Sequence, residues 1–153
     1  MSKKFYIATD HAGYAVKAYI KEVVTNLGHE IVDLGPESAD RVDYPDYAKK
    51  CAQAVLEDAG SLGILVCGTG IGISIAANKV PGIRAALCHD HYTAKLTRQH
   101  NDANILCFGE RVVGKGVIED MIEAFATTEF EGGRHAGRVA KIEGGCAFGA
   151  DLG

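Results

Sequence analysis

The sequence predicts a single doubly wound α/β domain, a five-stranded parallel sheet with helices on both faces in a Rossmann-like arrangement. Short apolar runs alternate along the chain with segments of helical periodicity, which is the pattern of βαβ units. No internal repeat, linker or low-complexity segment interrupts this alternation. The length of 153 residues fits one domain, and we assign residues 1–153 to it.

The five predicted strands are short runs of apolar residues. They cover residues 5–8, 31–34, 64–66, 85–88 and 105–108. Strands of a parallel sheet are buried on both faces, so continuous apolar runs are expected in place of strict alternation. The pattern does not order the last two strands within the sheet.

Apolar residues recur at helical spacing between these strands. The clearest pattern runs from Ala15 to Leu27, with Gly28 as the C-terminal cap. Four further helices are predicted over residues 47–55, 71–78, 91–100 and 117–126. A polar loop is predicted over residues 35–46, and a C-terminal helix with a glycine-rich tail from about residue 132.

Composition excludes several classes of partner. A net charge of −4 argues against nucleic acid or an anionic membrane surface. No apolar run approaches membrane-spanning length, and the N-terminus leads into a strand without a signal-peptide pattern. Five cysteines, an odd number without a C-x-x-C pair, indicate reduced thiols and a cytoplasmic protein.

The segment L-G-I-L-V-C-G-T-G-I-G-I-S at residues 62–74 is the most informative part of the chain. Its glycines allow a tight turn with outward-facing N–H groups, and the helix that follows presents its positive end to an anion. Cys67 lies at the end of the preceding strand, where this field favours the thiolate that a base or nucleophile requires. Thr69 adds a hydroxyl within the turn.

Nucleotide binding is an alternative reading of this turn. Asp90 lies about 20 residues further on, as the ribose-binding acid of a dinucleotide site would. However, the turn reads G-x-G-x-G, with Ile73 in place of the third glycine, and it follows the third strand instead of the first. No Gly-Lys-Ser/Thr follows, which excludes a Walker loop.

Metal binding is a second alternative, because Cys88-His89-Asp90-His91 is rich in possible ligands. Adjacent residues of an extended segment point to opposite faces, so at most two could reach one ion. No second cluster in the sequence supplies the other ligands, and we predict no metal.

A phosphosugar site is the third interpretation. Arg134 and Arg138 share one helical face and could hold a phosphate together. Arg111 follows strand five, at the end of the sheet where ligands bind in this fold. Asp10, His11 and His100 add groups that can move or orient protons; the first two lie near Cys67 if strands one and three are neighbours.

Five segments of the sequence resemble the ribose-5-phosphate isomerase B family, which also includes allose-6-phosphate and galactose-6-phosphate isomerases. They read TDHAGY, DYPDYA, CGTGIGISIAANKVPGIRAALCHD, TRQHNDANILCFGERVVG and FEGGRHAGRV. The resemblance runs in register over nearly the whole chain, up to about Glu143. RQHNDAN and GGRHAGR are more similar to the ribose enzyme than to the galactose subunits.

The resemblance implies an aldose–ketose isomerase that works through an enediolate without metal or cofactor. Cys67 matches the base that carries the proton between C1 and C2. One branch of the family has a glutamate a few residues downstream, where this chain has Ser74 or Ile75, so the cysteine branch applies. Thr69 and the amides of the turn match the oxyanion-binding group, which comprises Gly68, Gly70, Ile71 and Gly72.

The resemblance also assigns the remaining site residues. His100 matches the acid/base that opens the sugar ring, with Asn101 beside it. Asp10 and Tyr44 match residues that hold sugar hydroxyls. The phosphate and substrate-end contacts match His11, Arg111, Arg134 and Arg138.

The position of His100 predicts a site shared between subunits. In a doubly wound fold the helix after strand four runs away from the carboxyl ends of the strands. His100 closes that helix, and ten helical residues cover roughly 15 Å at about 1.5 Å each. His100 should therefore lie at the opposite edge of its own sheet from Cys67. We expect a homodimer with two shared sites that acts on a small sugar phosphate. Two such dimers could also associate as a dimer of dimers.

Overall fold

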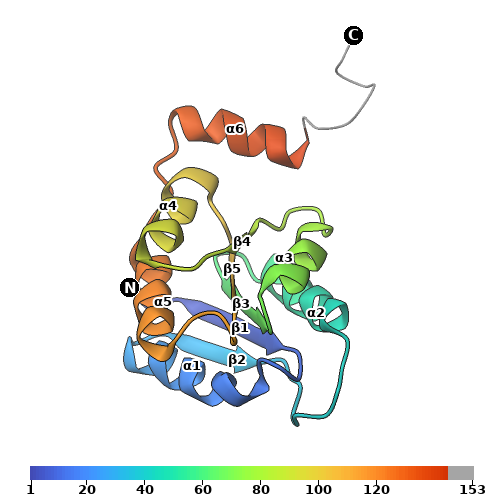
Figure 1. Ribbon diagram of the computed structural model, residues 1–153. Helices are drawn as coiled ribbons and strands as arrows, with labels where there is room; N and C mark the ends of the chain where they lie inside the picture. The colour runs from blue at the N-terminus through green and yellow to red at the C-terminus, as the bar shows by residue number, and fades with distance from the viewer. Residues whose placement is uncertain (145–153) are drawn as a thin grey trace.

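The computed structural model describes residues 1–144, over which five strands and six helices alternate (Figure 1). The strands are β1 (Lys4–Thr9), β2 (Glu30–Asp33), β3 (Leu62–Cys67), β4 (Ala85–Leu87) and β5 (Ile105–Gly109). The helices are α1 (Tyr14–Asn26), α2 (Tyr44–Glu57), α3 (Ile71–Asn78), α4 (His91–Asn101), α5 (Lys115–Thr127) and α6 (Arg134–Glu143). The glycine-rich tail and the fifth cysteine of the sequence lie outside the described residues.

All strand pairs in the sheet are parallel, and the strand order is β2-β1-β3-β5-β4. The predicted fold class is thereby confirmed, and the first and third strands are neighbours, which is the condition under which Asp10 and His11 lie near Cys67. β5 lies between β3 and β4, which settles the order that the sequence pattern left open. The chain reverses its winding direction between β1 and β3, so their carboxyl ends form the switch point at which such folds bind ligands.

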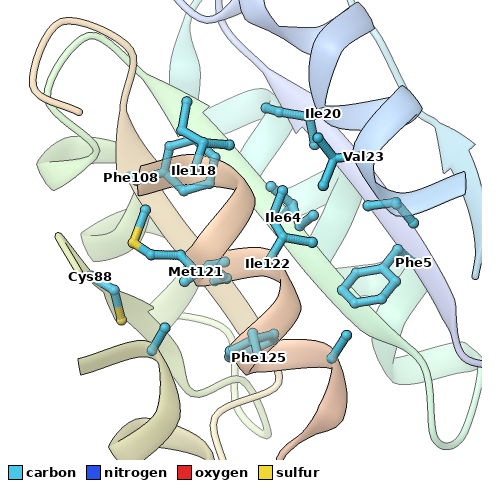
Figure 2. Close-up of a cluster of buried hydrophobic side chains, with 14 of the residues drawn as sticks. Phe5, Ile20, Val23, Ile64, Cys88, Phe108, Ile118, Met121, Ile122 and Phe125 are labelled. Carbon is cyan, nitrogen blue, oxygen red and sulfur yellow. The ribbon is translucent and has the colours of Figure 1, made fainter. Parts of the chain in front are cut away.

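Helices cover both faces of the sheet (Figure 1). One face packs against α1, α4 and α5, and the other against α2 and α3. The strand residues alternate accordingly: Ile64 and Val66 belong to the first cluster, Leu65 and Cys67 to the second. Figure 2 shows the first cluster, with Phe125 of α5 among its labelled side chains. The alternation turns the Cys67 thiol toward the layer formed by α2 and α3.

The second helix begins earlier than predicted. The sequence predicted a polar loop up to Asp46 and a helix from Tyr47, whereas α2 starts at Tyr44. Pro45 occupies the first turn of the helix, where its missing N–H has no helical partner to lose. The proline therefore marks the start of the helix and not the interior of the loop. This places Tyr44 on the first turn of α2.

Helix α6 stands apart from the two layers. Figure 1 shows it lying across the end of α4, beyond the sheet. The one buried residue of this helix is His135, whose ring stacks on that of His100 in α4. A helix with so little burial in the isolated chain leaves most of its surface open.

We predict that Phe125→Ala destabilises the fold by about 3–5 kcal/mol, because it empties a fully buried position between α5 and the sheet. Val117→Ala on the same helix is the matched control, since Val117 is 38% exposed and its truncation should change stability by about 0.5 kcal/mol or less. Urea unfolding at one fixed protein concentration measures the unfolding free energy of both variants. Similar losses for the two variants would contradict the assignment of the core.

Candidate active site

The glycine-rich turn joins the central strand β3 to α3. Gly70 caps the helix in the left-handed region, with φ of 79°. A Cβ at this position would lie 2.6 Å from the carbonyl carbon of Phe108 and 2.7 Å from Cδ1 of Leu87. Glycine is therefore required both by the backbone conformation and by the close approach of β5. The result is a tight turn that leads directly into the N-terminus of α3, the end of a helix that favours anions.

Cys67 lies at the base of this turn and is 5% exposed. Its Sγ accepts a hydrogen bond from the Gly70 N–H at 3.2 Å. The Gly70 N–H and the N-terminus of α3 both direct positive partial charge at this sulfur. Burial raises the pKa of Cys51 to about 12 and that of Cys88 to about 11. Burial also raises the pKa of Cys107 well above its usual range.

The loop after β5 is bonded to the glycine-rich turn. The Glu110 N–H donates to the carbonyl of Cys67 at 3.0 Å, and the Arg111 N–H donates to that of Gly68 at 3.1 Å. The Arg111 guanidinium lies against Gly68, where an added Cβ would be 3.1 Å from one of its nitrogens. Thr69 is exposed, and its Oγ1 accepts from the Ile71 N–H at 3.2 Å. The Arg111 guanidinium and the Thr69 hydroxyl thus both belong to the loops bonded around Cys67.

The loop after β1 completes this edge of the site. The Oδ1 atom of the buried Asp10 accepts from the N–H groups of Ala12 and Gly13 at 2.9 and 3.1 Å. The Asp10 N–H donates to the Val66 carbonyl of β3 at 3.2 Å, so the loop is tied to the central strand. The half-buried His11 accepts from the Val42 N–H through Nδ1 at 3.3 Å.

Tyr44 reaches the turn from α2. A Cβ on Gly72 would lie 2.7 Å from two carbons of the Tyr44 ring, so the ring lies directly against this glycine. The structure therefore gathers ten of the predicted residues at the carboxyl edge of the sheet. They are Asp10, His11, Tyr44, Cys67, Gly68, Thr69, Gly70, Ile71, Gly72 and Arg111.

The other four predicted residues lie at the opposite edge. His100 and Asn101 end α4, and the chain then turns through Asp102 into the amino end of β5. In the sheet, Ile105 pairs with Gly63 at one end of β5, and Gly109 pairs with Cys67 at the other. The four residue steps between them span about 13 Å at roughly 3.3 Å per residue. His100 and Cys67 are thus separated by the length of the sheet within one chain.

Arg134 and Arg138 belong to the His100 group, because α6 packs on α4. The imidazole rings of His100 and His135 stack with centroids 4.2 Å apart and planes 14° apart. Arg134 and Arg138 are exposed on either side of His135 along the helix. The two arginines are therefore presented with His100 and not with Arg111 and His11.

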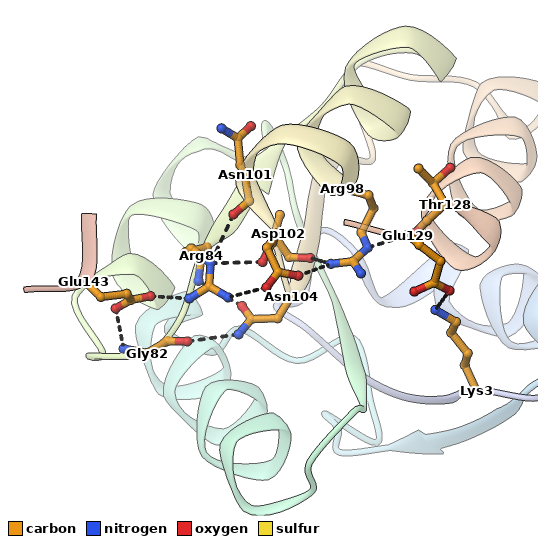
Figure 3. Close-up of polar contacts among 11 residues, drawn as sticks. Lys3, Gly82, Arg84, Arg98, Asn101, Asp102, Asn104, Thr128, Glu129 and Glu143 are labelled. Carbon is orange, nitrogen blue, oxygen red and sulfur yellow. Dashed lines mark hydrogen bonds and ion pairs between the residues drawn. The ribbon is translucent and has the colours of Figure 1, made fainter. Parts of the chain in front are cut away.

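Two arginines that the sequence analysis did not select hold this second group in place (Figure 3). Buried Arg98 donates to the carbonyls of Thr128 and Ala103 and to the Asp102 carboxylate. Arg84 donates through Nε to the carbonyls of Asn101 and Asp102 and pairs with Glu143 at the end of α6. Both satisfy carbonyls of the turn after His100, which explains how Asp102 is held with φ of 47°.

The structure does not gather ligands at the segment considered for metal binding. Asp90 caps α4 by accepting from the Thr93 N–H at 2.8 Å, and His91 pairs with Asp120 at 2.9 Å. This capping role accounts for the Asp90 carboxylate, so the ribose of a nucleotide is not needed to explain it. Over residues 1–144, the group of His, Cys, Asp and Glu side chains close enough to share an ion is His100, Glu131 and His135.

The sequence analysis missed His135, although this residue lies inside one of the quoted motifs. It is 4% exposed, and burial, with a contribution from the nearby Arg134, lowers the pKa of its imidazole. A neutral ring stacked on His100 avoids the repulsion of two imidazolium ions. The signal in the sequence was its position one residue after Arg134. The structure adds that it faces α4.

A parallel sheet whose central strand ends in a cysteine and an amide-lined turn has the layout of an enzyme for a small anionic substrate. The family model described as Ribose/Galactose Isomerase matches residues 5–142. The chain therefore belongs to the ribose/galactose isomerase family and is an enzyme of the aldose–ketose isomerase class.

Individual relatives agree with this assignment. The chain is 47% identical over 140 residues to ribose-5-phosphate isomerase B of Escherichia coli, covering 92% of this chain and 94% of the relative. It is 51% identical over 140 residues to a putative sugar phosphate isomerase of Bacillus subtilis, covering 91% of this chain and 94% of the relative. The solved structure of the type B ribose 5-phosphate isomerase of Trypanosoma brucei superposes with a TM-score of 0.90 at 51% identity, covering 94% of this chain and 98% of that one. Within residues 1–144, no helix has the length and apolar character to cross a membrane.

We predict that Gly109→Ala distorts the turn, because the new Cβ would lie 2.5 Å from the carbonyl carbon of Thr69. The backbone must move to relieve this contact, and we expect a loss of about 1–3 kcal/mol in unfolding free energy. Gly116→Ala is the matched control, since a Cβ there meets no atom within 4 Å. Equal stability of the two variants would show that the turn has more room than its contacts indicate.

Proposed function

We propose that the protein interconverts ribose 5-phosphate and ribulose 5-phosphate through an enediolate, without a metal or cofactor. The observation that carries this proposal is the Cys67 thiol, bonded to the Gly70 amide at the N-terminus of α3. Its support is the family membership and the 47% identity to the E. coli ribose-5-phosphate isomerase B. The composition and the cysteine pattern are the grounds for proposing a cytoplasmic enzyme.

In this mechanism Cys67 acts as the base of the isomerisation. In the open-chain aldose the thiolate removes the proton from C2, and the electron pair moves to form a C1–C2 double bond with negative charge on O1. The thiol then returns the proton to C1, and the proton of the C2 hydroxyl passes to O1, which leaves a ketone at C2 and a hydroxyl at C1. The substrate is oxidised at C2 and reduced at C1, so no external redox partner is needed.

The developing charge on the enediolate requires fixed donors. The amides from Gly68 to Gly72 and the exposed Thr69 hydroxyl lie beside Cys67, on the turn that leads into α3. Dipoles already oriented by the fold need no reorganisation when the charge appears, which is the condition under which they contribute most. Asp10 and Tyr44, from β1 and α2, are suited to hold the sugar hydroxyls.

His100 is proposed to open the furanose ring, by moving a proton from the anomeric hydroxyl to the ring oxygen, with Asn101 beside it. His100 and Cys67 of one chain lie at opposite ends of β5, which is about 13 Å long. A single sugar phosphate therefore cannot contact both residues of the same chain. We therefore propose that His100, Asn101, Arg134 and Arg138 act in the site of a partner subunit. There the two arginines would meet the phosphate together with His11 and Arg111.

A homodimer with two equivalent shared sites satisfies this requirement, because a twofold axis brings the carboxyl edge of each chain to the amino edge of the other. Large apolar side chains exposed beside both edges support such an interface. They are Tyr44, Ile71, Ile75 and Ile142, each at least 40% exposed in the single chain. A dimer of dimers would preserve the same sites.

An isomerase of six-carbon sugar phosphates is the second candidate, favoured by the inclusion of galactose isomerases in the family. An assay of chelator-treated protein on ribose 5-phosphate, allose 6-phosphate and galactose 6-phosphate separates the two. We expect ribose 5-phosphate to give the highest kcat/KM. A higher value for either hexose phosphate would transfer the assignment to that substrate.

Cys67→Ala should lower kcat by about 10²–10⁴-fold while substrate binding is nearly retained, because it removes the proton carrier and not the phosphate contacts. Cys88→Ala is the matched control: it truncates another buried cysteine, beyond the edge strand β4, and should keep its activity. Steady-state kinetics and substrate binding measured on both variants test this. An alanine variant at position 67 that retains more than about a few per cent of wild-type turnover would assign the proton transfer to another group.

Arg138→Ala should mainly raise KM, because a phosphate contact stabilises the ground state and the transition state alike. Part of the loss can also fall on kcat if the phosphate helps to orient C1 and C2. Lys95→Ala removes the same charge from an exposed position of α4 and serves as the control. Unchanged kinetics of the Arg138 variant would identify the α6 arginines as a solvated basic face.

Mixed dimers test the shared site. Cys67→Ala and His100→Ala should each be nearly inactive alone, and co-refolding equal amounts makes about half the dimers mixed, each with one intact and one doubly altered site. About a quarter of wild-type activity should return, whereas each variant refolded with itself should stay inactive. A mixture that remains inactive after subunit exchange has been confirmed would exclude the shared arrangement.

A further inference from the structure

Three metal-ligating side chains meet where α6 crosses α4. His100 ends α4, Glu131 lies in the segment before α6, and His135 lies in the first turn of α6. One ligand atom from each lies within 4.8 Å of the other two. The backbone fixes this juxtaposition, because the Glu131 N–H donates to the carbonyl of Gln99 at 3.0 Å and the His135 N–H donates to that of Gly132 at 3.0 Å.

The buried nitrogen of His135 lacks a hydrogen-bond partner. Its Nε2 atom is fully enclosed and makes no hydrogen bond, and the carboxylate of Glu131 is 3.5 Å away. A buried polar atom left in this state is costly, and such atoms are commonly explained by a missing water or ion. The carboxylate of Glu131 is therefore the acidic group beside this nitrogen, and the His135 ring itself stacks on that of His100.

Two imidazoles and one carboxylate are a common zinc-ligand set that leaves a fourth position open. At bond lengths of about 2.0–2.2 Å, tetrahedral ligands lie roughly 3.4 Å apart, somewhat closer than the spread of these three atoms. Ring-nitrogen lone pairs lie in the ring plane, and the two ring planes are only 14° apart, so the half-buried His100 must turn out of its stack on His135 for both rings to bind one ion. The exposed Glu131 side chain can follow this movement. The buried His135 provides the fixed ligand.

We infer that His100, Glu131 and His135 form a binding site for a divalent transition-metal ion such as zinc, and that the bound ion inhibits the enzyme. Binding itself follows from the three side chains. Inhibition rests on the proposed function of His100, because a ring nitrogen that coordinates a metal can no longer exchange a proton with the sugar. The ion is thus a reversible inhibitor and has no part in the isomerisation.

Binding is tested on the whole protein after chelator treatment and desalting. Calorimetric titration with zinc should give one ion per chain, and cobalt should produce visible absorption bands without a thiolate-to-cobalt charge-transfer band. Glu131→Gln and His135→Gln should each weaken zinc binding by at least about 10–100-fold, because each loses a direct ligand. His91→Gln, which removes another exposed histidine paired with a carboxylate, should bind zinc like the wild type.

The outcomes separate the site from its consequence. A thiolate band, or equal zinc affinity in Glu131→Gln and the wild type, would assign the ion to cysteine or to adventitious ligands and overturn the site. Because Glu131 is exposed, this variant remains decisive even if substitution of the buried His135 impairs folding.

The inhibition arm measures isomerase activity against added zinc, with recovery on adding chelator. The zinc concentration for half inhibition should rise by at least about tenfold in Glu131→Gln. Zinc that binds at this site without inhibiting would disprove the inhibitory role and count against His100 as the ring-opening group. Absence of binding would overturn the site while leaving the proposed isomerase activity untouched.

Discussion

The close approach of β3 and β5 at their carboxyl ends is the constraint on which the site depends. Cys67 pairs with Gly109 in the sheet, and an added Cβ on Gly109 or Gly70 would meet the backbone of the other loop at 2.5–2.6 Å. Only because side chains are absent there can the turn fold over the strand end and direct the Gly70 amide at the Cys67 sulfur. The path of the glycine-rich turn and the positions of Cys67 and Arg111 beside it follow from this one packing contact.

The opposite edge of the sheet is organised by two arginines, of which Arg98 is buried. Arg98 lies under the end of α4 with its guanidinium bonded to two carbonyls and a carboxylate, and its charge centre lies 5.7 Å from the centroid of the Phe125 ring. Such a charge is tolerated in the interior because its donors are satisfied. The same network holds the turn that carries His100 and, through Arg84 and Glu143, the far end of α6. One chain therefore carries its candidate site residues in two groups at opposite edges of the sheet, which is the structural argument for proposing a shared site.

Over the described residues, the sequence predicted the type of every element and its succession along the chain, because apolar periodicity is a local property of the chain. The misplaced start of α2 shows the limit of such patterns: Pro45 is compatible with both a loop and the first turn of a helix, and only the helical backbone observed from Tyr44 decides between them. The cysteine, the glycine-rich turn and the arginine pair were likewise recognisable, since each is a short motif.

What the sequence determined by itself was the alternation of strands and helices, the glycine-rich turn after β3 and, through its motifs, the family. The tertiary structure alone decided that β5 separates β3 from β4, that Arg84 and Arg98 support the turn after His100, and that Glu131 and His135 meet His100. The physical reason is the range of the interactions. Local periodicity and turn chemistry act over a few residues, whereas strand order and the burial of a charge result from packing between segments far apart in the chain.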